Sequence, residues 1–139
     1  MENYPVNLEI RIDWSELDLF GHVNNVMFFK YIQAARVRYW ETIGLTQSFE
    51  QTNIGPILAS TACRFRKPLH YPGIIHVCTC MDFIRNTSFG LRHIIVDETG
   101  DIAAEGEDVV VVYDFTRREK MPFPDALRRA VEAVEKRSF

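Results

Sequence analysis

The chain has 139 residues, of which 47% are hydrophobic and 25% charged, and its formal net charge is −3. A chain of this length and composition can build one core without disulfides or a metal. Its slightly acidic balance excludes the basic surface of a nucleic-acid-binding protein, and no apolar run approaches the roughly 18 residues of a membrane span, so we expect neither nucleic acid nor a membrane as partner.

The N-terminal third of the chain predicts a strand followed by a long helix. Residues 6–14 alternate between apolar and polar side chains well enough for a strand. Asn24 and Asn25 are good N-cap residues, and the helical pattern that follows at 26–43 ends before Gly44. Apolar side chains occupy more than one side of this helix, which indicates a helix nearly surrounded by its own sheet or by a partner subunit.

The rest of the chain predicts antiparallel strands and a terminal helix. After a loop at 46–56, four strand-like runs follow, at 57–69, 74–85, 88–96 and 102–115. Their connections are too short for parallel crossovers. Residues 123–136 predict an amphipathic helix.

These elements predict an α+β fold over one domain, residues 1–139, in which a five-stranded antiparallel sheet wraps one long helix and a C-terminal helix follows. Such a sheet cannot enclose the helix alone, so we expect at least a homodimer, or a homotetramer.

The cysteines and the N-terminal residues indicate the cellular compartment of the protein. Cys63, Cys78 and Cys80 are an odd number, with no Cys-x-x-Cys spacing and no further ligands nearby, so we expect buried, reduced thiols and no metal site. Residues 1–7 lack the basic and apolar regions of a secretory signal. Both features favour the cytoplasm.

The segment from Asp18 to Asn25 is the densest cluster of chemically useful residues. A helix start supplies unpaired N–H groups that could stabilise the oxyanion formed from a thioester carbonyl. The Asp18 carboxylate could attack that carbonyl or activate water, and Gly21 would let backbone and ligand approach closely. The same residue types also make a plain capping loop, and His22 also suits a structural role, so spacing alone leaves both interpretations open.

The run from Arg11 to Asn25, R-I-D-W-S-E-L-D-L-F-G-H-V-N-N, resembles the signature of the 4-hydroxybenzoyl-CoA thioesterase family. Segments 65–73 and 85–88 resemble two further blocks of that family, and the likeness covers residues 8–97. It implies a hotdog fold and hydrolysis of an acyl- or aroyl-CoA to the free acid and CoA, with no cofactor beyond the CoA of the substrate.

The resemblance also implies roles for single residues. Asp18 matches the family's catalytic aspartate, and the backbone N–H of Asn25 matches the group that polarises the thioester carbonyl. Gln33 stands where a related branch has a catalytic glutamate, so Asp18 has to act without it. His22 is expected to position the substrate or to have a structural role, and not to act as a base.

Further residues are candidates for substrate binding, although each also suits a core or solvent-facing role. Apolar groups near the helix start would line an acyl pocket, and cations would meet the phosphates of CoA. The expected substrate-binding residues are Phe20, Gly21, Met27, Phe28, Lys67, Arg85 and Ser88. Arg36 lies on the apolar side of the helix, where a buried guanidinium needs a partner, and we expect a structural ion pair there.

Two alternatives stay open at this point. A non-catalytic acyl-CoA or fatty-acyl binding protein would keep the groove but not the reaction. A thioesterase acting on acyl carrier protein would need a basic docking surface, for which Arg64, Arg66 and Lys67 are candidates.

Overall fold

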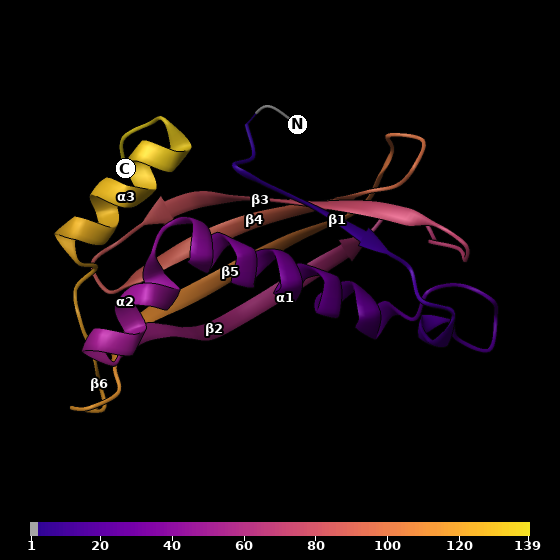
Figure 1. Ribbon diagram of the computed structural model, residues 1–139. Coiled ribbons are helices and arrows are strands. Elements are labelled where there is room, and N and C mark those ends of the chain that lie inside the picture. The colour runs from indigo at the N-terminus through magenta and orange to yellow at the C-terminus, as the bar shows by residue number, and fades with distance from the viewer. Residues whose placement is uncertain (1–2) are drawn as a thin grey trace.

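The computed structural model describes residues 3–139, in which one long helix lies across a curved antiparallel sheet (Figure 1). The strands run in the order β1-β3-β4-β5-β2 across the sheet, and the two-residue β6 pairs with β5. Their bounds are β1 Val6–Arg11, β2 Ile54–Phe65, β3 Ile74–Ile84, β4 Ser88–Val96, β5 Ile102–Asp114 and β6 Glu119–Lys120. Neighbouring strands are antiparallel throughout, as the short connections predict.

The sheet has one face toward the long helix and one away from it. On β4, Leu91 and Ile95 belong to the main core, whereas Arg92 between them points to the other face. The second strand begins at Ile54, before the predicted start at residue 57, and ends at Phe65 rather than at residue 69. It ends there because the next two amides both donate to a single carbonyl, that of Ala103, so the ladder stops.

The long helix α1 (Asn25–Thr42) begins and ends close to where the sequence predicts. Asn24 is the N-cap, and its side chain accepts a hydrogen bond from the backbone N–H of Val26 (3.0 Å). The helix packs very closely on β5, because a Cβ at Gly106 would lie 2.8 Å from the Cδ1 atom of Ile32. Its buried residues are Phe28, Tyr31, Ile32, Ala35, Tyr39 and Trp40.

The structure corrects the prediction of a loop at 46–56. Gly44 adopts φ 81°, which turns the chain, and a second helix α2 (Leu45–Thr52) begins directly after it. Only Leu45 of this helix is buried. The sequence therefore shows almost no apolar periodicity there, and we missed the helix for that reason.

The C-terminal helix α3 (Asp125–Glu135) lies at one end of the sheet (Figure 1). Its last residue is fixed to the rest of the fold by one carboxylate oxygen. Glu135 Oε2 accepts hydrogen bonds from the Tyr39 hydroxyl (2.6 Å) and from the Met81 backbone N–H (2.8 Å). The second of these bonds lies at a register shift between β3 and β4.

Apolar side chains remain exposed along β2 and on one flank of α1. Leu58 is 41% exposed, and Ile57 and Phe65 of the same edge strand are exposed as well. On α1, Val26 and Val37 face solvent. No helix within residues 3–139 is long and apolar enough to cross a membrane.

Two of the three cysteines are buried, as the sequence predicts, and the third is less buried than predicted. Cys78 and Cys80 are buried, Cys63 is half-buried, and all three are free. Burial raises the pKa of each thiol.

Candidate active site

The segment between β1 and α1 forms a small closed loop around Asp18. Leu17 and Val23 form an antiparallel bridge at its base, and the backbone N–H of Asp18 donates to the carbonyl of His22 (2.8 Å). Gly21 has φ 83°, a conformation that favours glycine, and it does not line the hollow described below. The turn therefore explains Gly21 without the close ligand approach that the sequence suggested.

The two carboxylate oxygens of Asp18 have different surroundings. Oδ1 accepts hydrogen bonds from the backbone N–H groups of Phe20 (2.8 Å) and His22 (3.3 Å). Within residues 3–139, no donor forms a hydrogen bond to Oδ2. The loop thus fixes the carboxylate through one oxygen and leaves the other open.

The first turn of α1 has one backbone donor to spare. The N–H of Asn24 donates to Glu16, that of Val26 to the Asn24 side chain, and that of Met27 to the Asn24 carbonyl. The N–H of Asn25 has no intrahelical acceptor by position, and none among residues 3–139. This free donor lies at the positive end of the helix dipole.

Asp18, His22 and Asn25 come together around one open hollow of about 480 Å³. Phe28 supplies an apolar wall and Lys67 a cation, so five predicted residues line it. Arg66, a candidate docking cation from the sequence, lines it as well. Sequence reasoning missed the other lining residues, which are Val23, Phe65 and Pro68. The only signal for the last two was the resemblance of segment 65–73 to the family.

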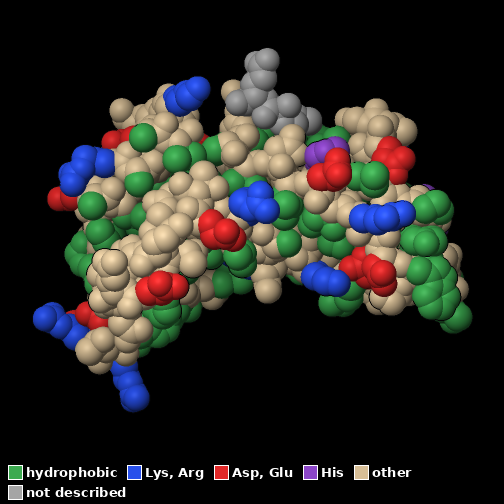
Figure 2. All heavy atoms as spheres, in the orientation of Figure 1, with side chains coloured by type: hydrophobic (Ala, Val, Ile, Leu, Met, Phe, Trp, Pro, Cys, Tyr) green, Lys and Arg blue, Asp and Glu red, His purple; other side chains and the backbone are tan. Residues whose placement is uncertain are grey.

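Besides Gly21, four predicted binding residues lie outside this hollow. Phe20 is 81% exposed at the loop tip, where apolar side chains gather at one end of the molecule (Figure 2). Met27 is half-buried and packs against the core. Arg85 and Ser88 lie at the β3–β4 turn, where the backbone N–H of Arg85 donates to the carbonyl of Ser88 (2.7 Å).

Arg85 and Ser88 lie far from the Asp18 hollow of their own subunit. The third strand begins beside the end of β1, where Ile12 donates to the Gly73 carbonyl, and runs for 11 residues to the turn. At about 3.3 Å per residue, the turn lies some 30 Å away.

Two further side chains adjoin the site. The His70 ring meets the His22 ring edge to face, with centroids 4.9 Å apart, and sequence reasoning had no signal for this contact. The Lys67 ammonium contacts Asp97 (2.5 Å) and Asp101 (2.9 Å). The hydrogen bond from Lys67 and a second from Thr99 hold the pKa of Asp97 well below its usual range. Much of the charge of Lys67 is therefore already neutralised.

A second group of ionisable residues is buried inside the sheet. Asp108 Oδ2 contacts Arg36 Nε (2.9 Å) and His93 Nε2 (2.6 Å), and His93 Nδ1 contacts the Thr79 hydroxyl (2.7 Å). Burial by itself would raise the pKa of Asp108, but the bonds from His93 and Arg36 lower it to about 2. This arrangement confirms the structural ion pair expected for Arg36.

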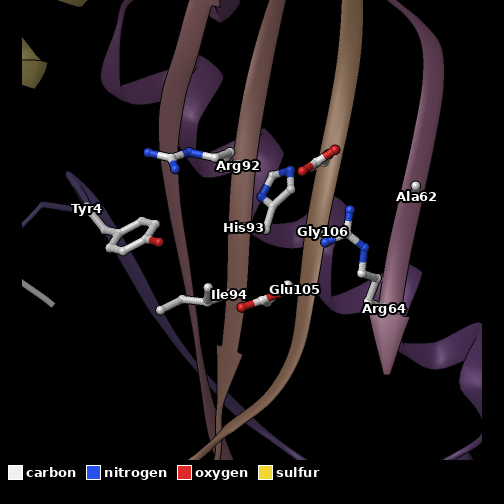
Figure 3. Close-up of a pocket in the computed structure, with 9 residues that line it drawn as sticks. Tyr4, Ala62, Arg64, Arg92, His93, Ile94, Glu105 and Gly106 are labelled. Carbon is white, nitrogen blue, oxygen red and sulfur yellow. The ribbon is translucent and has the colours of Figure 1, made fainter. Parts of the chain in front are cut away.

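A separate hollow of about 200 Å³ opens on the face of the sheet away from α1. Figure 3 shows Arg92 and Arg64 around it, with Tyr4 reaching in from the N-terminal segment and Glu105 below. Arg64 therefore lines this hollow and not the one beside Asp18. Within residues 3–139, no three His, Cys, Asp or Glu side chains are grouped to hold a metal.

Comparison with known proteins identifies the family. Residues 12–131 match the model of the Thioesterase-like superfamily. The long-chain acyl-CoA thioesterase FadM of Escherichia coli is 20% identical over 92% of this chain and 98% of its own. A Thermus thermophilus thioesterase solved with coenzyme A and Zn is 27% identical, with a TM-score of 0.88 over 100% of both chains. The DHNA-CoA thioesterase of Staphylococcus aureus, 19% identical, shares the fold with a TM-score of 0.81 over 94% of this chain and 91% of its own. The chain belongs to the Thioesterase-like superfamily and is a hotdog-fold thioester hydrolase.

Proposed function

We propose that this protein hydrolyses an acyl-CoA to the free acid and CoA, with Asp18 acting on the thioester carbonyl and the Asn25 N–H polarising it. One observation carries the proposal. The open oxygen of Asp18 and the unpaired donor of Asn25 belong to residues that line the same hollow. A reaction needs both groups free, because a nucleophile or base and an oxyanion donor must each meet the substrate.

The chemistry follows from these two groups. The thioester oxygen accepts a hydrogen bond from Asn25, and the helix dipole adds stabilisation as negative charge develops on that oxygen. In one route, Asp18 attacks the carbonyl carbon, the C–S bond breaks, the CoA thiolate takes a proton, and water then hydrolyses the acyl anhydride. In the other, Asp18 takes a proton from a water that attacks the same carbon, the C–S bond breaks, and the CoA thiolate takes that proton. Both routes use the same carboxylate.

Coenzyme A is favoured over acyl carrier protein as the acyl carrier. FadM is named for long-chain acyl-CoA, and the Thermus thioesterase was solved with coenzyme A. Two of the three proposed docking cations for a carrier protein are already paired, Arg66 with Glu105 and Lys67 with two aspartates, and Arg64 lines the separate hollow on the other face of the sheet. Little free positive charge is left there to attract an acidic carrier.

The acyl group would enter the hollow over its apolar wall. The rings of Phe28 and Phe65 meet edge to face there, with centroids 5.0 Å apart. This wall suits an acyl or aroyl group, while the thioester faces the polar side formed by Asp18 and Asn25.

We also propose that two copies of this chain form a homodimer through the β2 edge. The outer side of β2 has no neighbouring strand within residues 3–139, and its apolar side chains are exposed. Arg85 and Ser88 could reach an Asp18 hollow only from a second subunit. Sedimentation equilibrium should give a dimer or a larger even assembly, and Leu58→Lys should weaken it because a charge on an edge strand opposes pairing. A wild-type monomer at micromolar concentration contradicts the dimer.

The test of the enzyme activity is thiol release from a panel of CoA thioesters, from acetyl through long-chain to benzoyl and phenylacetyl. Wild type is compared with Asp18→Asn, and with Asp125→Asn as a matched control at the exposed start of α3. We expect turnover by wild type and the control, and a loss of roughly 10²- to 10⁴-fold in Asp18→Asn. If no thioester is cleaved while acyl-CoA still binds, the protein is a binding module.

A further inference from the structure

We infer that Glu16 is a positioning residue that holds the Asp18 loop at a fixed distance from the start of α1. The inference rests on the proposed function, since it concerns how Asp18 and the Asn25 N–H are brought to one substrate. Sequence reasoning gave Glu16 no role.

Both oxygens of the Glu16 carboxylate are occupied by donors from two different elements. Oε1 accepts from the backbone N–H of Asp13 (2.8 Å) and from the hydroxyl of Tyr31 (2.8 Å), and Oε2 accepts from the ammonium of Lys30 (2.9 Å). Asp13 precedes the loop, whereas Tyr31 and Lys30 lie on the second turn of α1. The carboxylate therefore connects the entry of the loop to the helix.

The backbone of Glu16 also connects the loop to α1, through a hydrogen bond. Its carbonyl accepts the N–H of Asn24, the N-cap residue of α1 (2.9 Å). The next residue, Leu17, forms the bridge to Val23 that closes the loop. Asp18 thus follows two residues after a point that is fixed to the first turn of the helix by its backbone and to the second turn by its side chain.

Burying the Glu16 carboxylate costs free energy, and packing alone does not explain why a charged side chain stands there. Glu16 is only 6% exposed, and a buried charge is unfavourable unless it is fully hydrogen-bonded. Burial would raise its pKa, but the hydrogen bonds from Lys30, Asp13 and Tyr31 outweigh that effect and lower it. An apolar side chain would fill the space more cheaply, but it could not fix the distance between loop and helix through directed bonds.

The precision of this distance matters for the reaction. A misplacement of about 1 Å between reacting groups can reduce a rate on the order of 100-fold. Among residues 3–139, the Asp18 carboxylate is held only by two amides of its own loop, so its distance from Asn25 depends on the contacts that Glu16 makes.

The experiment compares kcat and KM for an acyl-CoA substrate in wild type, Glu16→Gln and Tyr31→Phe. The glutamine keeps the shape but turns an N–H group toward a donor, and the phenylalanine keeps the ring and removes one bond. Glu9→Gln is the matched control, because Glu9 is an exposed carboxylate on β1. We expect kcat to fall roughly 10- to 100-fold in Glu16→Gln and less in Tyr31→Phe, with KM within about threefold of wild type and Glu9→Gln unchanged.

Affinity for a non-hydrolysable thioether analogue and amide hydrogen exchange complete the test. The analogue should bind both variants as it binds wild type, while the amides of residues 17–24 exchange faster in Glu16→Gln. If Glu16→Gln does not fold, Tyr31→Phe carries the test. Variants that keep the wild-type kcat would contradict the role of Glu16 and leave the proposed function standing. The same holds for variants in which only KM rises and analogue affinity falls. A wild type that cleaves no thioester overturns the proposed function and this inference with it.

Discussion

Two aspartates of this chain each have a histidine close by, one at the surface and one in the interior. Asp108 contacts His93 at 2.6 Å and Arg36 at 2.9 Å, and its side chain is 0% exposed. Asp18 has its neighbour His22 in the same open hollow, and one of its oxygens has no partner among residues 3–139. By hydrogen-bond geometry alone, the buried pair looks more like a catalytic dyad. It is the less useful one for a reaction, because every group in it is already satisfied and no substrate can reach it.

The buried cluster instead ties the fold together. Thr61 of β2 also donates to Asp108 (2.8 Å), and Thr79 of β3 contacts His93. With Arg36 on α1, the cluster joins four strands and the long helix. A satisfied buried polar network of this kind specifies one arrangement of the elements, whereas an unsatisfied surface pair is free to act on a ligand.

The largest expected effect on stability comes from the buried pair. Asp108→Asn removes the charge that faces Arg36 and His93 and leaves a buried guanidinium without its counter-ion. We expect the free energy of unfolding to fall by about 3–5 kcal/mol. Urea unfolding at pH 7 measures it, with Asp125→Asn as the exposed control. A loss below about 1 kcal/mol would mean that the cluster does not hold the fold together.

The same pair predicts how stability depends on acid. The pKa of Asp108 is lowered to about 2 in the fold, from 3.8 for the free group. A lowered carboxyl pKa adds stability above the unfolded value, and this is lost as the pH falls from about 4 toward 2. The difference between wild type and Asp108→Asn should therefore shrink across that window. A difference that is constant from pH 7 to pH 2.5 contradicts the assignment.

A smaller effect on activity is expected when His22, the histidine beside Asp18, is replaced. The His22 ring packs against His70 and makes no hydrogen bond to any of residues 3–139. His22→Ala should therefore lower kcat/KM by no more than about tenfold, which corresponds to roughly 1.4 kcal/mol. Its free energy of unfolding should stay within about 0.5 kcal/mol of wild type. A loss as large as that of Asp18→Asn would make His22 an acid or base of the reaction.

The smallest effect is expected for Lys67. Its ammonium is 38% exposed and already paired with Asp97 and Asp101, so it has little charge left for a CoA phosphate. Lys67→Met should change KM by less than about tenfold and stability by less than about 1 kcal/mol. A larger rise in KM, with kcat unchanged, would show that Lys67 leaves its aspartates to bind the substrate.

Features that depend on local pattern were predictable from the sequence. Asn24 as N-cap, the bounds of α1 and the strands at 74–85 and 88–96 all follow from neighbouring residues. Asp18, His22 and Asn25 meet because the last lies only seven positions after the first. The polar helix α2 was missed because only one of its residues is buried.

Contacts between residues far apart in the chain could not be predicted from the sequence pattern. Arg36 was expected to have a partner, but Asp108 is 72 positions away, and no periodicity points to it. Glu16 was given no role from the sequence, because its partner Tyr31 lies 15 positions further on. Arg85 and Ser88 were expected by resemblance to bind the substrate, and the length of β3 separates them from the Asp18 hollow of their own subunit.

The most direct test of the comparison is kcat/KM per folded molecule for Asp18→Asn and Asp108→Asn, with the free energy of unfolding measured on the same samples. Asp18→Asn should lose roughly 10²- to 10⁴-fold in turnover and keep its stability, because the amide oxygen can still accept the N–H groups of Phe20 and His22. Asp108→Asn should lose stability and keep most of its turnover in the fraction that remains folded. If Asp18→Asn keeps its turnover while folded Asp108→Asn loses it, the reaction does not use the surface carboxylate, and the assignment of the two aspartates is reversed.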